Sequence, residues 1–99
     1  MKNILGDLNK VFESRIRLGI MSILLVHQSV DFSTLKEQLD ITDGNLASHI
    51  TALEKIKYVQ TKKKFIGKKP NTSYAATNAG RKAFLEHLNA LEKFINGSI

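Results

Sequence analysis

The residues best suited to bind a ligand in this sequence are basic, and they are concentrated in one segment. The chain has a net charge of +6, yet residues 55–82 hold nine basic residues and no acidic one. The nine are Lys55, Lys57, Lys62, Lys63, Lys64, Lys68, Lys69, Arg81 and Lys82. Such cations bind phosphate oxygens and release counterions, so their clustering indicates a polyanionic partner. A solvated, lysine-rich surface is the alternative interpretation.

Small polar residues precede the basic segment and offer a different chemistry. They are Thr42, Asn45, Ser48 and His49. An asparagine amide can pair with adenine through two hydrogen bonds, and serine, threonine and histidine can bond base edges or phosphates. Alternatively, Thr42 only caps a helix and the other three are solvated surface. The basic segment that follows favours contact with nucleic acid.

Catalytic and metal-binding patterns are missing from the sequence. It contains no cysteine, and its three histidines, His27, His49 and His87, have no short ligand spacing, so we expect no metal site. It also lacks a glycine-rich phosphate loop and the Gly-x-Ser-x-Gly pattern. The scattered acidic residues suit pairing with surface lysines better than pairing with each other. We therefore expect no enzymatic activity and no cofactor.

Length and hydropathy favour a cytoplasmic protein with one domain over residues 1–99. The longest apolar stretch, residues 20–26, is far shorter than the roughly 18 residues that a membrane span needs. The first residues lack the continuous apolar stretch of a secretory signal. We expect neither membrane insertion nor secretion.

Apolar residues at helical spacing and polar capping residues predict five helices. The first carries Ile4, Leu5, Leu8, Val11 and Phe12, and the next four follow the capping residues Ser14, Ser33, Thr42 and Thr77. In the helix over residues 43–56, a narrow apolar stripe leaves Asn45 and Ser48 on the opposite face. Gly19, inside the second helix, predicts the close approach of another helix.

Alternating residues after the fourth helix predict a β-hairpin. Its strands cover residues 58–66 and 72–76, its turn covers residues 67–71, and a further short strand lies near residues 30–32. Lys68 and Lys69 then lie at the hairpin tip, and the alternation points Lys63 away from Lys62 and Lys64. The predicted class is mainly α with a small β-hairpin.

Three stretches of this sequence resemble winged helix-turn-helix regulators. They are Asp31-Phe32-Ser33-Thr34-Leu35, then residues 41–50 with Leu53-Glu54 and Tyr58-Val59, and finally residues 72–77 with Ala79-Gly80-Arg81-Lys82-Ala83-Phe84. Together they are similar to the multiple-antibiotic-resistance (MarR) and arsenical-repressor (ArsR) families over nearly the whole chain. The resemblance implies a recognition helix in the major groove of DNA, a wing on phosphate or minor groove, and a homodimer on a pseudopalindromic operator.

The resemblance implies roles for the two polar sets. Thr42, Asn45, Ser48 and His49 would belong to the recognition helix. Lys63, Lys68, Lys69 and Arg81 would contact phosphate or the minor groove, although for Arg81 a structural role is equally open. Lys57 stands where many relatives have glycine, which predicts a left-handed backbone at a cost of about 1 kcal/mol.

The first and last helices carry more large apolar residues than the domain needs for its own core. We expect them to form a dimer interface through Leu5, Leu8, Phe12, Phe84, Leu88, Leu91 and Ile95. The alternative is that both helices pack onto their own core.

The sequence thus predicts a regulator that binds double-stranded DNA sequence-specifically, as a homodimer and without catalysis. Two other functions stay open: a winged-helix module that binds an acidic protein, and a binder of double-stranded RNA. No small-molecule effector can be identified from the sequence.

Overall fold

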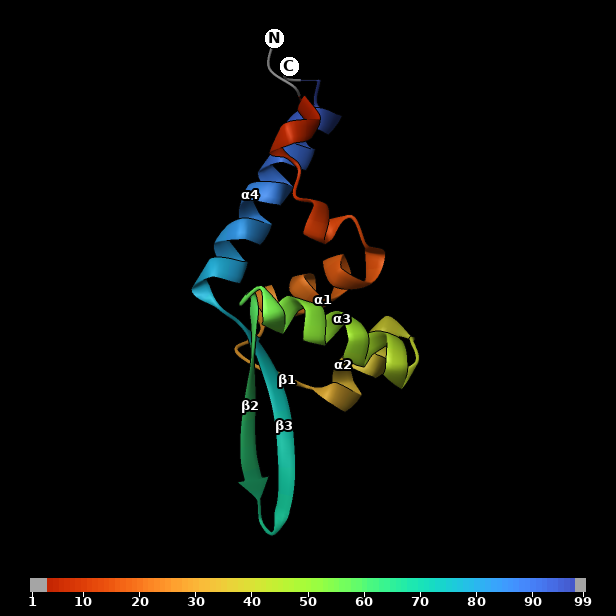
Figure 1. The fold of residues 1–99 in the computed structure, drawn as a ribbon, viewed down its shortest axis with the longest axis vertical. Helices are drawn as coiled ribbons and strands as arrows, with labels where there is room; N and C mark the ends of the chain where they lie inside the picture. The colour runs from red at the N-terminus through yellow and green to blue at the C-terminus, as the bar shows by residue number, and fades with distance from the viewer. Residues whose placement is uncertain (1–3, 98–99) are drawn as a thin grey trace.

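The computed structural model describes residues 4–97, so residues 1–3 and 98–99 of the predicted domain lie outside the described part. Figure 1 shows its helices and strands. In chain order they are η1 (Ile4–Asp7), η2 (Lys10–Phe12), α1 (Arg15–Val26), β1 (Val30–Asp31), α2 (Phe32–Leu39), α3 (Asp43–Lys55), β2 (Val59–Ile66), β3 (Lys69–Ala76) and α4 (Asn78–Ile95). The fold is mainly helical with a small antiparallel sheet, which confirms the predicted winged helix class.

Three of the four predicted N-caps are confirmed. The hydroxyls of Ser14, Thr42 and Thr77 accept backbone N–H groups in the first turns of α1, α3 and α4. The prediction for Ser33 is wrong, because the Asp31 carboxylate caps α2 by accepting the Thr34 N–H at 2.8 Å. Hydrogen bonds from Thr34 also lower the pKa of Asp31 below its usual 3.8.

The continuous helix predicted for residues 4–12 is wrong. The segment instead forms two short 3-10 turns, η1 and η2, separated by Leu8 and Asn9, and Asn9 is in an extended conformation. The Asn9 side chain accepts the Val11 N–H at 3.0 Å, and its own N–H donates to Nδ1 of His87 at 2.9 Å. Since the Asn9 N–H is bonded to α4, it is not available to a continuous helical ladder.

The sheet has the strand order β1-β3-β2, and both pairings are antiparallel. The β2–β3 register runs from Val59 opposite Ala76 to Ile66 opposite Lys69. The connection is therefore Gly67 and Lys68, tighter than the predicted turn over residues 67–71, with Gly67 left-handed at φ 65°. The result is a long hairpin, hereafter the wing, covering residues 59–76.

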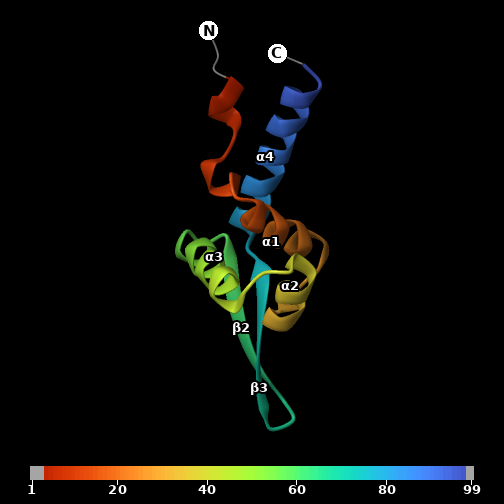
Figure 2. The ribbon, with the colours of Figure 1, turned by 90° about the vertical axis from the view of Figure 1, so that its right-hand side faces the viewer.

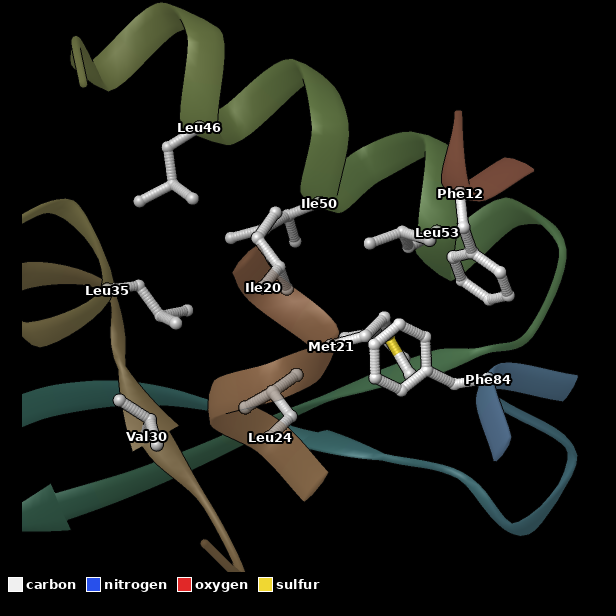
Figure 3. Close-up of a cluster of buried hydrophobic side chains, with 11 residues drawn as sticks. Phe12, Ile20, Met21, Leu24, Val30, Leu35, Leu46, Ile50, Leu53 and Phe84 are labelled. Atoms are coloured by element: carbon white, nitrogen blue, oxygen red, sulfur yellow. The ribbon is translucent and has the colours of Figure 1, made fainter. Parts of the chain in front are cut away.

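The core is built around α1, as Figure 3 shows. Ile20, Met21 and Leu24 of α1 are fully buried and meet the stripe from α3, Leu46, Ile50 and Leu53. A Cβ on Gly19 would lie 2.5 Å from Cδ2 of Leu39, which confirms the predicted close approach of another helix, α2. This packing holds one face of α3 against α1 and leaves the opposite face of α3 exposed to solvent.

Two projections leave this core in opposite directions, and the molecule measures 58 × 25 × 21 Å. Figures 1 and 2 show the wing extending from one end and α4 from the other, with η1 running beside α4. None of the helices within residues 4–97 is long and apolar enough to cross a membrane.

Candidate nucleic-acid interface

Helix α3 exposes small polar side chains opposite its buried stripe. Asn45 and Ser48 are exposed, as is Thr42, whose hydroxyl accepts the Asn45 N–H at 3.2 Å. Thr51, one turn further along, is also exposed; sequence reasoning missed it, although its spacing of three from Ser48 could have indicated it. Small side chains on an outer face let a helix approach a groove closely.

His49 is partly buried and is held by a partner from another helix. Its Nδ1 accepts the Nε–H of Arg17 at 3.0 Å, and Arg17 also donates to the Val11 carbonyl. Burial, and then the Arg17 charge, lower the pKa of His49 below 6.5. The neutral ring therefore carries its proton on Nε2, leaving that N–H as its one donor to a ligand. Arg17 therefore orients His49 in this candidate site, a role that sequence reasoning missed.

The wing begins directly after α3 and is tied to it. The Tyr58 N–H donates to the Leu53 carbonyl at 2.9 Å, and the Thr61 hydroxyl donates to the Glu54 carboxylate. Lys57 lies between the two elements at φ 64°, which confirms the expected left-handed conformation. The lysine-rich hairpin is thus fixed relative to the polar face of α3.

The wing lysines are all exposed. Lys62, Lys63 and Lys64 lie opposite Ser73, Thr72 and Asn71, while Lys68 is in the turn and Lys69 begins β3. Within residues 4–97 none of them is in an ion pair with a carboxylate; by contrast, Lys36 pairs with Asp43 at 2.8 Å. The wing therefore presents uncompensated positive charge to solvent.

Arg81 lies away from the wing tip and has a structural contact. Its Nη1 donates to the Leu25 carbonyl at 2.9 Å, which satisfies an acceptor at the end of α1. The structure thus favours the structural role for Arg81 and does not support grouping it with the wing lysines.

Two residues predicted for a dimer interface belong to the core instead. Phe12 and Phe84 are each 1% exposed, and their rings meet edge to face with centroids 5.2 Å apart. They are unavailable to a second copy, so their assignment to the interface is wrong. The reason is that the first half of α4, including Gly80 and His87, packs against its own core.

The remaining predicted interface residues lie on the α4 projection and on the N-terminal segment beside it. Leu5, Leu88 and Ile95 are exposed, whereas Leu8 and Leu91 are half-buried. Leu85 and Phe94 are exposed as well, and sequence reasoning missed them. Leu85 precedes Leu88 by three residues, so helical spacing alone could have indicated it.

The partly buried His49 and the buried His87 should make the folded protein less stable in weak acid. Burial lowers the pKa of His87, with a smaller opposing effect of Glu13, and the pKa of His49 is lowered too. Below pH 6.5 the unfolded chain therefore binds protons that the folded chain does not, so stability falls as pH drops through this window. Asp31, with its pKa below 3.8, acts only at lower pH.

Thermal melting between pH 7.5 and 5.5 checks this prediction. The melting temperature should fall with pH for the unmodified protein, and His87→Gln and His49→Gln should each flatten the dependence. A melting temperature that is constant over this range in the unmodified protein would rule out the proposed linkage.

Comparison with known proteins agrees with this geometry. Residues 16–95 match the family model described as a winged helix DNA-binding domain. An uncharacterised protein of Methanocaldococcus jannaschii is 39% identical over 79 residues, which cover 80% of this chain and 86% of that protein.

Solved structures show the same arrangement. A transcriptional regulator homologue from Pyrococcus horikoshii is 36% identical and superposes with a TM-score of 0.78, covering 93% of this chain and 96% of that one. The YusO protein of Bacillus subtilis, 16% identical, shares the fold with a TM-score of 0.81 over 97% of this chain and 67% of its own. This chain is a member of the winged helix DNA-binding domain family.

Proposed function

We propose that the chain is a sequence-specific, double-stranded DNA-binding transcription regulator that acts as a homodimer. The observation that carries the proposal is that two surfaces of different chemistry lie on consecutive elements that are hydrogen-bonded to each other. The polar face of α3, with Asn45 and Ser48, is joined through Lys57 to a wing whose lysines have no acidic partner within residues 4–97. One surface suits base edges, and the other suits phosphates.

The proposed mechanism is occupancy of DNA and needs no catalytic step. Helix α3 enters the major groove, where each base pair presents a distinct pattern of donors and acceptors. The wing reaches the neighbouring backbone, and each neutralised phosphate releases counterions. Family and fold likewise point to a DNA-binding regulator rather than an enzyme.

The homodimer is proposed because one recognition helix covers only a few base pairs. Exposed apolar residues on α4, among them Leu85, Leu88 and Ile95, offer a surface that a second copy can bury. A symmetric pair of recognition helices would read a pseudopalindrome, with half-sites about one helical turn apart.

Substitutions on α3 should reduce sequence discrimination. Asn45→Ala or Ser48→Ala should narrow the gap between preferred and random DNA by about 1 to 3 kcal/mol for each good bond to a base that the variant can no longer form. Affinity for random DNA should barely change, because phosphate contacts dominate it. Titration of each variant against the two duplexes measures the gap.

Asn89→Ala is the matched control, since it removes an exposed asparagine from α4 rather than from α3. It should leave the gap unchanged. Asn45→Ala keeps the Thr42 cap, because the bond uses the backbone N–H of residue 45. If both α3 variants discriminate as well as the unmodified protein, α3 is not the reading element.

A further inference from the structure

Two large apolar side chains lie at the tip of the wing. Phe65 is 75% exposed and Ile66 is 66% exposed, and they are the last two residues of β2. Pro70 lies opposite Phe65 across the hairpin, and Lys69 lies opposite Ile66. Within residues 4–97 no element packs over these side chains, so their apolar surface faces water at a free-energy cost.

The position of this pair excludes a role in the core. At the near end of the wing, Val59 and Ala75 are buried. The tip lies at the far end of the hairpin, away from every helix, as both ribbon views show. Apolar residues that folding leaves exposed on a projection are typical of a contact with another molecule.

The charges around the tip indicate the chemistry of that molecule. Lys62, Lys63 and Lys64 precede Phe65, and Lys68 and Lys69 follow Ile66, with no acidic residue anywhere in residues 55–82. Such a surface repels a second copy of itself and attracts a polyanion. The minor groove of DNA offers both features at once, since phosphates line its edges and stacked bases lie between them.

We propose that Phe65 inserts into the minor groove as an apolar wedge and partly unstacks one base step there. This inference rests on the proposed DNA-binding function and adds a contact to it. We assign the insertion to Phe65 rather than to Ile66 for two reasons. Phe65 is aromatic, and it lies opposite Pro70, whose ring restricts the backbone. Ile66 points to the other face of the hairpin, because successive side chains of a strand alternate.

The wedge would make the wing selective for deformable DNA. Pyrimidine–purine steps, such as TA, unstack most easily, so the wing favours them without forming a base-specific hydrogen bond. The lysines on both sides would hold the backbone while the ring enters the step. Phe65 thereby adds a preference at a position that α3 does not reach.

The test uses the full chain and duplexes with 2-aminopurine at TA steps beside the preferred site. Binding of the unmodified protein should raise the fluorescence at the step where the wing lies, because 2-aminopurine brightens when it unstacks. Phe65→Ala should abolish this rise and weaken binding about tenfold at every salt concentration. The slope of log affinity against log salt should not change, since no charge is removed.

Three variants serve as comparisons. Phe65→Leu should keep part of the affinity, since it stays apolar without the aromatic ring. Lys68→Ala should lower the salt slope while keeping the fluorescence rise. Val26→Ala removes an equally exposed apolar side chain, 75% exposed, at the end of α1, and should change neither. Thermal melting of Phe65→Ala should match the unmodified protein.

The outcomes separate this inference from the function on which it rests. Unchanged affinity of Phe65→Ala, or binding without a fluorescence rise at any flanking step, would overturn the wedge alone. If the unmodified protein binds no duplex, the proposed function and the wedge both fail. If Phe65→Ala weakens binding to phosphatidylglycerol vesicles and not to DNA, the tip is a membrane contact and the wedge is wrong.

Discussion

Replacing Lys68 and Lys69 together by alanine should weaken binding to every duplex by about a hundredfold to a thousandfold at physiological salt. In a dimer the change removes four cations from the wings, and each phosphate that is no longer neutralised lowers the salt slope by up to about 1. The preferred sequence should stay the same, because phosphate contacts carry no base information. Titration of preferred and random duplexes over a salt series measures both quantities.

The matched control for this variant is the pair Lys10→Ala and Lys93→Ala. Both residues are exposed and lie outside the wing, on η2 and α4, so the control lowers the net charge of the protein by the same amount. It should have a small effect on affinity and slope. If the control weakens binding as much as the wing variant does, the protein is attracted by net charge alone and the wing makes no specific contact.

Leu88→Asp should convert the proposed homodimer into monomers. Leu88 is 36% exposed and lies on α4 near exposed Leu85. A carboxylate placed in an apolar interface without a partner costs several kcal/mol, on the order of a hundredfold or more in association. Sedimentation at about 50 μM, where a micromolar dimer is largely formed, should show the unmodified protein as a dimer and the variant as a monomer.

Gln38→Asp controls for the added charge, since residue 38 is an exposed polar residue on α2 and not on α4. This variant should remain dimeric. Because Leu88 is partly exposed, neither change should unfold the protomer, and thermal melting of the monomeric variant checks this point. If the unmodified protein already sediments as a monomer at this concentration, the interface on α4 is wrong.

Capping residues next to a helix were enough to predict where most helices begin. The prediction failed for α2, where pairing with a strand distant in the sequence determines which residue is the cap. Ser14, Thr42 and Thr77 each cap the helix that directly follows, so the bond involves residues close in the chain. Asp31 and Ser33 were both capable caps for α2. Asp31 pairs with Ser73 of β3, which holds it in the extended conformation that a cap needs.

Long-range partners explain the other differences. The N–H of Asn9 bonds to His87, 78 residues further along the chain, and no local pattern in residues 4–12 indicates that break. Arg81 bonds to the Leu25 carbonyl across 56 residues, so a basic residue in a basic segment also has a structural contact that its position in the sequence does not indicate. The sequence shows which residue types are present, but tertiary packing decides which of them remain exposed and able to contact a ligand.

The apolar stripe on α4 divides into two parts, because only its first half is covered by the protomer's own core. A stripe with helical spacing shows that one face is covered, not what covers it. Phe84 is covered by the protomer's own core, whereas Ile95, three turns later, extends past that core and is 78% exposed.

Selection of bound duplexes from a random pool tests the proposed function most directly. The full chain is mixed with the pool at physiological salt, and bound molecules are recovered and sequenced over several rounds. The proposal predicts enrichment of a pseudopalindrome whose half-sites lie about one helical turn, or roughly 10 base pairs, apart. A pool that stays random after binding has been demonstrated would contradict sequence-specific recognition by this protein.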